Sequence, residues 1–301
     1  MEGLINRLAA FAGRDQILVD EPMARHTTFK VGGPADVMFL PRSGEQVALA
    51  LKAAQALDVP AIVVGNGSNL VVRDGGIRGL VVALGENMAR LTREGDEVRA
   101  EAGASLSRLA SFAQSEGLAG LEFAGGIPGT VGGGCAMNAG AYGGQLSDVL
   151  VDALVLLDGE ARTMSREALE MGYRTSLPLR MGGVVLSARF ALTPDAPGEI
   201  AGRMRELNTR RRDKQPLNYP SAGSTFKRPE GHFAGALIEQ AGLKGTSVGA
   251  AQVSPKHAGF IVNTGGAKAR DILELIDIVQ REVLARFGVL LETEVRVLGE
   301  D

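Results

Sequence analysis

The segment best suited to chemistry is a glycine-rich run from Ala124 to Gly144, AGGIPGTVGGGCAMNAGAYGG. Glycine has no side chain and reaches backbone angles closed to other residues, so such a run lets main-chain N–H groups wrap an anionic phosphate. A flexible linker is the alternative, but linkers are rich in Ser, Pro and charge, whereas this run contains Ile127, Val131 and Tyr142. The run therefore predicts a cradle for a phosphate-bearing cofactor.

Four further segments hold residues that could do chemistry, and each also has a plain structural interpretation. Arg25–Asp36, RHTTFKVGGPAD, has the form of a turn entering a strand. Tyr173–Ser176, YRTS, offers a guanidinium for a carboxylate, although Arg beside Tyr is also a common surface pair. Arg210–Lys214, RRRDK, suits a helix C-terminus, where cations complement the dipole, and could equally hold a diphosphate. Ser221–Pro229, SAGSTFKRP, has no G-x-S-x-G elbow, so proton donation fits its serine better than a hydrolase nucleophile.

The last candidate segment is Glu292–Val297, ETEVRV, which alternates as a strand does. Alternation places Glu292, Glu294 and Arg296 on one face. Solvent exposure alone explains three charged residues on one face, so the segment by itself does not indicate a site.

Composition excludes several classes of protein. The 301 residues include 32 Lys and Arg against 35 Asp and Glu, and a net charge of -3 with 4% aromatic residues argues against nucleic-acid binding. A hydrophobic content of 45% supports a large core, and the length predicts about two domains. The single Cys135 excludes an internal disulfide, and the three histidines are scattered, so we expect no metal. We expect a cytoplasmic protein, because no apolar run could span a bilayer and the N-terminal residues lack the apolar core of a signal peptide.

The elements that must position these residues follow from the hydrophobic spacing. Ser43 and Gln46 form a capping box at the start of a helix that ends before Val59. Ala61–Val64 and Leu70–Val72 then read as strands joined by a turn, GNGSN. The dinucleotide fingerprint G-x-G-x-x-G opens a helix instead, and it is absent from the sequence, as is a P-loop. A Rossmann site is therefore disfavoured.

The rest of the chain alternates between strands and helices. The predicted strands are Gly79–Leu84, Glu97–Glu101, Leu150–Leu157, Gly183–Leu192, Gly259–Asn263 and Val289–Leu298, and the predicted helices run from Ser105 to Gly117, about Glu199 to Arg212, Ala234 to Gly242 and about Arg270 to Gly288. The last helix is the clearest, since its apolar residues from Ile272 to Val283 form one stripe. Thr193–Gly198 is the best linker candidate, so we place a domain boundary near it.

Taken in order, these segments resemble the UDP-N-acetylenolpyruvoylglucosamine reductases, the MurB family of bacterial peptidoglycan synthesis. The matching motifs are RHTTFKVGGPAD, VVGNGSNL, the AGGIPGTVGG…NAGAYG run, YRTS, AGSTFK and LETEVR, which together span about Arg25 to Arg296. The resemblance implies an α+β fold: an FAD-binding module of the vanillyl-alcohol-oxidase (PCMH) type over 1–195, in subdomains of about 1–75 and 76–195, followed by a C-terminal α+β substrate-binding domain over 196–301.

The resemblance also implies a reaction. NADPH reduces FAD, and flavin N5 then passes a hydride to the enolpyruvyl ether of UDP-N-acetylglucosamine-enolpyruvate, giving UDP-N-acetylmuramate. Charge develops beside the substrate carboxylate and must be stabilised before a proton arrives. By match to the family motifs, Ser224 is the proton donor, Arg174 and Glu294 hold and polarise the substrate carboxyl, and Arg210 and Lys214 contact the substrate or its diphosphate.

The FAD-binding residues implied by the resemblance lie in two segments. They are Val64, Gly65, Asn66, Gly67, Ser68, Asn69 and Leu70 in the first, and Ala124, Gly125, Gly126, Pro128, Gly129, Gly132, Gly133, Asn138, Gly140 and Ala141 in the second. The expected ligands are small molecules only, with no nucleic acid and no membrane insertion.

The chain departs from some relatives in two places. No inserted loop that could carry a closing tyrosine follows Arg174, so the chain resembles the shorter class of the family, and Arg228 stands where many relatives have asparagine. A flavin oxidase of the same fold is the main alternative function, and it would react with oxygen and ignore NADPH. A catalytically silent nucleotide-binding regulator is the other, although such a protein is expected to lose at least one of Arg174, Ser224 and Glu294.

Overall fold

The protein is described from a computed structural model that covers residues 1–301. The chain forms two compact units, each built from three segments. The first unit comprises Met1–Leu18, Val37–Asn66 and Gly79–Arg211, and the second comprises Val19–Asp36, Gly67–Arg78 and Arg212–Asp301. The chain passes between them inside strands β1 (Ile17–Pro22), β2 (Pro34–Phe39) and β5 (Ile77–Ala83), in the loop after β3 (Ala61–Val64), and near the end of helix α6 (Pro197–Lys214).

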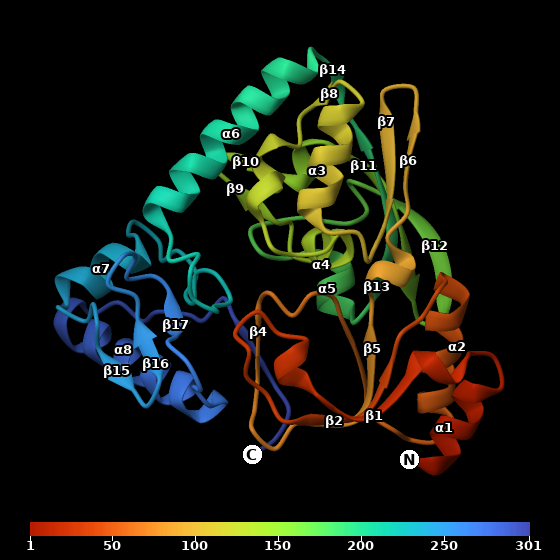
Figure 1. Cartoon of the computed structure of the whole chain (residues 1–301), viewed down its shortest axis with the longest axis horizontal. Coiled ribbons are helices and arrows are strands. Elements are labelled where there is room, and N and C mark those ends of the chain that lie inside the picture. The colour runs from red at the N-terminus through yellow and green to blue at the C-terminus, as the bar shows by residue number, and fades with distance from the viewer. The chain divides into compact units, whose positions relative to one another are not determined.

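The larger sheet of the first unit has five strands in the order β12-β11-β13-β7-β6, and all neighbours are antiparallel. Its strands are β6 (Leu91–Glu94), β7 (Glu97–Glu101), β11 (Leu150–Leu157), β12 (Glu160–Ser165) and β13 (Val184–Ala191). Helices α3 (Leu106–Ser115) and α4 (Val131–Ala136) lie against this sheet (Figure 1). Residues such as Leu109, Val155 and Phe190 form a closed apolar core between them.

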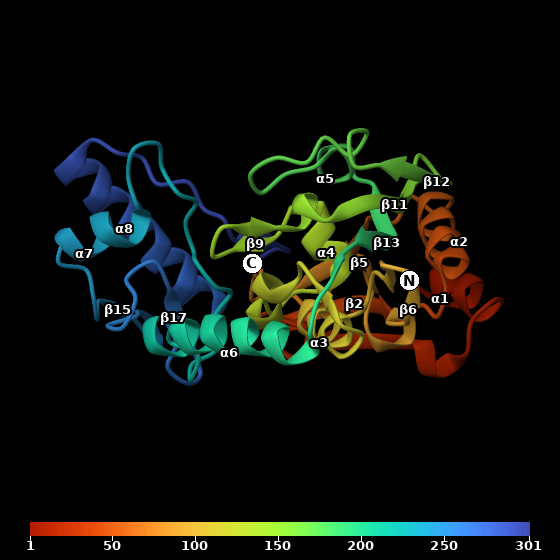
Figure 2. The same ribbon diagram turned by 90° about the horizontal axis from the view of Figure 1, so that it is seen from above.

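A second sheet has the order β1-β2-β5-β3, with β3 parallel to β5. Helices α1 (Glu2–Ala9) and α2 (Gly44–Gln55) lie side by side next to it (Figure 2). Leu4 and Leu8 from α1 and Val47 from α2 are fully buried with Phe39 in one cluster. Burial of one face of each helix therefore holds this layer together.

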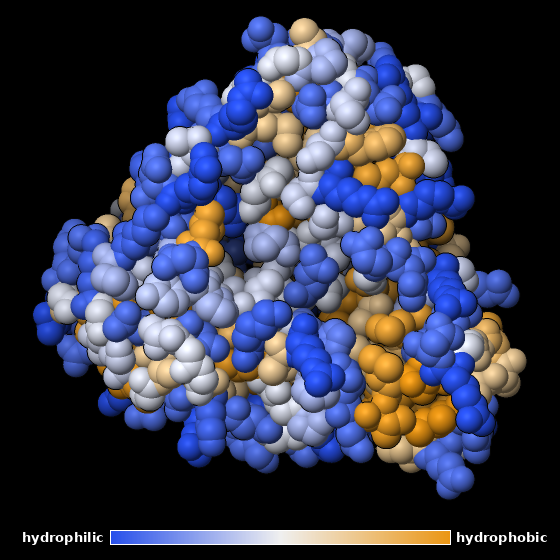
Figure 3. Space-filling view, in the orientation of Figure 1, coloured by the Kyte–Doolittle hydropathy of each residue, from blue (hydrophilic) through white to orange (hydrophobic).

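The remaining elements of the first unit are short, except for α6. They are β8 (Leu118–Ala119) paired with β14 (Thr193–Pro194), β9 (Gly140–Ala141) paired with β10 (Gly144–Gln145), and α5 (Leu177–Met181). Helix α6 shows a mostly hydrophilic surface in the view of Figure 3. Its buried contacts come from Ile200, with Met204 and Leu207 packed on the main core.

The second unit is a small α+β assembly. A three-stranded antiparallel sheet, β15-β16-β17 (Ser247–Val248, Ala251–Val253 and Ile261–Asn263), packs on helices α7 (Ala234–Gln240) and α8 (Ala269–Phe287) (Figure 1). The stripe of α8 from Ile272 to Val283 is buried in this core. Strand β4 (Leu70–Val72) pairs in parallel with β18 (Arg296–Leu298), so two segments of this unit that are distant in sequence lie side by side.

Most elements match the sequence. Ser43 caps α2 and accepts a hydrogen bond from Gln46 N at 3.2 Å, as predicted. The second half of the capping box does not form, because Gln46 Oε1 accepts from Arg42 N at 2.7 Å. The predicted strands at Ala61–Val64, Leu70–Val72 and Leu150–Leu157 are confirmed, and α8 starts and ends within one residue of its predicted bounds. The expected domain boundary after residue 195 stays a prediction, while the compact units divide the chain later, after Arg211.

Two expectations about local structure are wrong. The predicted linker Thr193–Gly198 instead contains β14 and the start of α6, because Thr193 pairs with Ala119 and Pro197 suits the first position of a helix. The predicted strand Val289–Leu298 is regular only at Arg296–Leu298. Upstream, Thr293 makes only an isolated antiparallel bridge with Phe226. Glu294 N and Val295 N then both donate to a single acceptor, the carbonyl oxygen of Thr225, so regular pairing stops there.

Candidate active site

The strand-to-strand turn after β3 packs closely on the glycine-rich run within the first unit. A Cβ at Gly65 would overlap the Thr130 hydroxyl and lie 3.3 Å from its Cγ2. The neighbouring Asn66 Nδ2 donates to the carbonyl oxygen of Pro128 at 3.5 Å. Only glycine permits this approach at position 65, so the two segments predicted to bind one cofactor do lie together.

This junction has main-chain donors to offer. The N–H groups of Asn66, Gly129 and Thr130 make none of the hydrogen bonds within the protein. The Thr130 hydroxyl accepts from Gly133 N at 3.4 Å and so caps α4. Unbonded main-chain N–H groups on two adjoining glycine-rich segments suit a phosphate, and the residues present therefore fit the diphosphate of FAD.

The second half of the same turn belongs to the second unit. Gly67 has a φ of +59°, and a Cβ there would overlap the His26 carbonyl oxygen and lie 2.9 Å from Thr27 Cα. Asn69 lies further along, where its Nδ2 donates to Glu294 O at 2.9 Å and its own carbonyl oxygen accepts from Arg296 N at 2.9 Å. The RHTTFKVGGPAD and LETEVR motifs therefore both support this turn.

Ser224 and Glu294 are brought together by one buried residue, Thr225. Thr225 N donates to Gly259 O at 2.9 Å, its hydroxyl accepts from Ile261 N at 3.2 Å, and its carbonyl oxygen accepts from Glu294 N at 2.8 Å. With all three groups bonded, Thr225 fixes the backbone on both sides of the pair. Ser224 is exposed and Glu294 is partly buried. Sequence reasoning did not single out Thr225, and its only signal is its place inside AGSTFK.

Arg174 lies in the first unit, on a tight turn closed by two hydrogen bonds between the backbones of Gly172 and Thr175. Its φ is +57°, a left-handed conformation that side chains rarely adopt, so the surrounding turn must hold it. Ser176 supplies that support, because its hydroxyl donates to Ala136 O at 2.7 Å and caps α5. The guanidinium of Arg174 stacks over Tyr173, 5.1 Å from the ring centroid.

The two expected substrate-binding cations are exposed residues of α6. Arg210 forms an ion pair with Glu206 one turn earlier, and Lys214 ends the helix. Arg228, the departure from many relatives, stacks over Phe233 with its guanidinium carbon 4.0 Å from the ring centroid.

Several glycines of the run serve packing. Gly125 and Gly126 make room for residues of α6, since a Cβ would lie 3.0 Å from Met204 Cε at the first and 3.0 Å from Arg211 Nη1 at the second. Asn138 is buried and its amide is satisfied inside the protein, with Nδ2 3.3 Å from Gly172 O and Oδ1 3.0 Å from Ser147 N. A role in cofactor binding for Gly125, Gly126 and Asn138 stays a prediction.

Cys135 lies within the glycine-rich run, on α4, but its thiol is not reactive. Burial raises the pKa of the Cys135 thiol to about 12, so it is neutral and inert at pH 7. No group of three or more His, Cys, Asp or Glu could hold a metal ion, and none of the helices is long and apolar enough to cross a membrane.

Comparison with known proteins identifies the family. Residues 215–298 match the model of the UDP-N-acetylenolpyruvoylglucosamine reductase C-terminal domain, and residues 35–165 match that of an FAD binding domain. The UDP-N-acetylenolpyruvoylglucosamine reductase of Agathobacter rectalis is 52% identical over 297 residues, covering 94% of each chain, and that of Clostridium tetani is 50% identical over 298 residues, covering 99% of this chain and 97% of the relative.

Solved structures agree with the sequence comparison. The MurB enzyme of Thermus caldophilus has a TM-score of 0.79 with 37% identity, over 94% of this chain and 98% of that one. The grass pollen allergen Phl p 4, with a TM-score of 0.51 and 15% identity over 64% of this chain and 44% of that one, is similar in fold alone. The chain therefore belongs to the UDP-N-acetylenolpyruvoylglucosamine reductase family, oxidoreductases of peptidoglycan synthesis, and has the family's α+β fold of an FAD-binding domain followed by a C-terminal domain.

Proposed function

We propose that this protein reduces UDP-N-acetylglucosamine-enolpyruvate to UDP-N-acetylmuramate at the expense of NADPH, in the cytoplasm. When bound, FAD supplies the redox chemistry, taking a hydride from NADPH and passing it to the vinyl group of the substrate. One proton is consumed at the carbon next to the carboxylate, so the overall reaction turns substrate, NADPH and H⁺ into product and NADP⁺. The residues of this chain must hold the carboxylate, stabilise its developing charge and deliver that proton.

The observation that carries the proposal is the pairing of Ser224 with Glu294 across Thr225. The Glu294 backbone bonds the residue next to Ser224, and the Ser224 side chain is exposed. An accessible hydroxyl suits proton delivery to carbon, whereas an oxidase needs a base that removes a proton. Thr225 is bonded through its N–H, its carbonyl and its hydroxyl, so the backbone that carries both groups is rigid before any ligand arrives. Such preorganisation is what proton transfer to a reacting carbon requires.

Each remaining residue has a role that its chemistry supports. Arg174 would hold the substrate carboxylate through its planar guanidinium, and its left-handed turn would fix the direction of that side chain. Glu294 near that carboxylate would share a proton with it, because two adjacent like charges resist joint ionisation. Arg210 and Lys214 would contact the diphosphate of the substrate, for which Arg210 exchanges its ion pair with Glu206.

The test is anaerobic NADPH oxidation by a substoichiometric amount of the purified flavoprotein, with and without UDP-N-acetylglucosamine-enolpyruvate. We expect one equivalent of NADPH to be consumed per FAD without the substrate, and many turnovers with it. NADH in place of NADPH tests the coenzyme, and mass spectrometry of the product tests for a gain of two hydrogens.

Two results would contradict the proposal. A flavin that NADPH reduces but that stays reduced after the substrate is added would remove the substrate assignment. Reoxidation by oxygen with turnover of a small alcohol, and no response to NADPH, would identify the oxidase alternative instead.

A further inference from the structure

Arg211 lies in an unusual place on α6. The apolar residues by which this helix packs on the first unit are Ile200, Met204 and Leu207, spaced at i, i+4 and i+7. Arg211 is the next member of the stripe, at i+11, where the pattern calls for an apolar side chain. A Cβ at Gly126 would lie 3.0 Å from both Cδ and Nη1 of Arg211, so the whole side chain is laid against the glycine-rich run.

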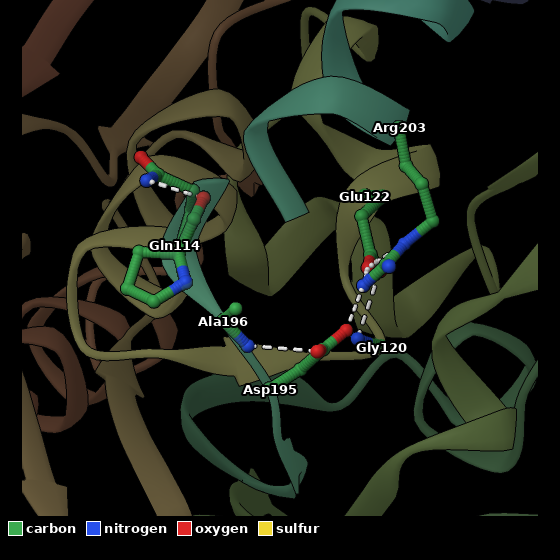
Figure 4. A network of polar contacts seen from close by, with 7 residues as sticks. Gln114, Gly120, Glu122, Asp195, Ala196 and Arg203 are labelled. Carbon is green, nitrogen blue, oxygen red and sulfur yellow. Dashed lines mark hydrogen bonds and ion pairs between the residues drawn. The ribbon is translucent and has the colours of Figure 1, made fainter. Parts of the chain in front are cut away.

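Polar contacts, shown in Figure 4, fix the start of α6 to Glu122, two residues before the glycine-rich run, and to helix α3. Arg203 Nε and Nη2 donate to Glu122 Oε1 at 2.9 and 2.7 Å, and Nη2 also donates to Asp195 Oδ2 at 2.7 Å. The other oxygen of Glu122 accepts from Gly120 N at 2.8 Å. Gln114 Nε2 holds the first turn through Pro197 O at 3.1 Å. Because Glu122 begins the 3-10 helix η4 (Glu122–Gly126), this clamp sets where Arg211 meets Gly126.

Arg211 is the one partly buried arginine of this helix, since Arg203, Arg205, Arg210 and Arg212 are all exposed. Arg203 and Arg210 both form ion pairs, whereas the partly buried Arg211 guanidinium makes no ion pair and no hydrogen bond. Burial lowers the pKa of Arg211 from its ordinary value, and the nearby Tyr142 phenol acts in the opposite direction. Burying a cation without a counter-charge costs stability, so a cation held in this way points to an anion supplied by a ligand.

The nearest ligand site is the cradle itself. Gly126 is three residues before Gly129 and four before Thr130, whose free N–H groups suit an anion. We propose that Arg211 is a cofactor-binding residue that pairs with an anionic part of bound FAD. Two parts of FAD have that chemistry: the diphosphate, which is always charged, and the pyrimidine end of the flavin, which gains negative charge on reduction. The inference rests on the proposed function only in taking FAD as the cofactor.

The test compares R211M and R211K with R205M, which removes an exposed arginine from the same helix. We expect R211M to weaken FAD binding by about 10- to 100-fold, the worth of one charge-assisted hydrogen bond, as measured by flavin fluorescence during reconstitution of the apoprotein. If the partner is the reduced flavin, binding of oxidised FAD stays unchanged, and a 10- to 100-fold loss on reduction lowers the two-electron midpoint potential by about 30 to 60 mV. R211K should recover part of either loss, and R205M should match the wild type.

Thermal unfolding of the apoprotein separates binding from folding. Because R211M removes a partly buried cation that has no counter-charge in the protein, its apoprotein should unfold at the wild-type temperature or higher, while the rise in unfolding temperature on adding FAD should shrink. The proposal fails if R211M matches R205M in both FAD affinity and midpoint potential, or if only the binding of the enolpyruvyl substrate changes. It also fails if the R211M apoprotein is destabilised and R211K restores nothing. None of the FAD measurements uses the enolpyruvyl substrate, so their outcome does not depend on the outcome of the reductase assay.

Discussion

The ion pair between Glu122 and Arg203 is expected to do more for stability than surface pairs of the same residue types. Two nitrogens of Arg203 converge on one oxygen of Glu122 at 2.9 and 2.7 Å, and the Glu122 side chain is only 13% exposed against 45% for Arg203. Such geometry places the coupling energy at about 1 to 2 kcal/mol, above the range of exposed pairs. Removing Arg203 alone should cost about 2 to 3 kcal/mol, because the Glu122 carboxylate stays buried with only Gly120 N as its partner.

A double-mutant cycle of E122Q and R203M measures this coupling directly. Unfolding in urea is the suitable assay, since guanidinium chloride would itself screen the pair. The matched control is Glu282 with Arg286 on α8, an i,i+4 pair at 3.3 Å whose side chains are 46% and 52% exposed. We expect about 0.3 to 0.5 kcal/mol there. A coupling between Glu122 and Arg203 no larger than that of the control pair would refute the argument that α6 is clamped to η4.

Three further outcomes follow from single positions. G67A should greatly weaken FAD binding, because its φ is +59° and the added Cβ would overlap a backbone carbonyl; G85A, which has no atom within 4 Å of the new Cβ, should bind FAD as the wild type does. N69A should slow the substrate half-reaction in stopped flow more than it slows flavin reduction by NADPH, because it removes the amide that holds the backbone of Glu294; equal slowing of both would contradict this role. Cys135, with its pKa raised to about 12, should contribute stability that is full below about pH 8.5 and falls by at most about 1.4 kcal/mol per unit as the pH rises toward 12. The difference in unfolding free energy between wild type and C135A should shrink over that range, and a constant difference would contradict the assignment.

Helices with a single strong signal were predictable from the sequence. The Ser43 cap and the apolar stripe of α8 both depend on contacts within a few residues, which spacing reports directly. The irregular backbone of Glu292–Val297 could not be predicted from the sequence. Alternation cannot reveal that Thr225, distant in sequence, accepts hydrogen bonds from two successive N–H groups and interrupts the strand pairing. Long-range partners of this kind override local pattern.

The candidate site shows the same division. The turn from Gly65 to Asn69 was predicted from its glycines, and the structure adds why Gly67 is needed, since a Cβ there meets the backbone of the RHTTFK segment. The role of Arg211 could not be predicted because it stands between two other arginines. Charge alone does not distinguish the partly buried arginine from its exposed neighbours. Gly125 and Gly126 are predicted to contact the cofactor, and their lack of a side chain also allows α6 to approach.

The most direct test of the central claim, that Ser224 delivers the proton, is a stopped-flow comparison of the two half-reactions in S224A. The account predicts wild-type reduction of the flavin by NADPH, and reoxidation by the enolpyruvyl substrate slowed by about 10² to 10⁴-fold, the worth of a general acid. S221A, a serine three residues earlier in the same segment, should change neither rate. Equal slowing of both half-reactions in S224A, or wild-type reoxidation, would contradict the account.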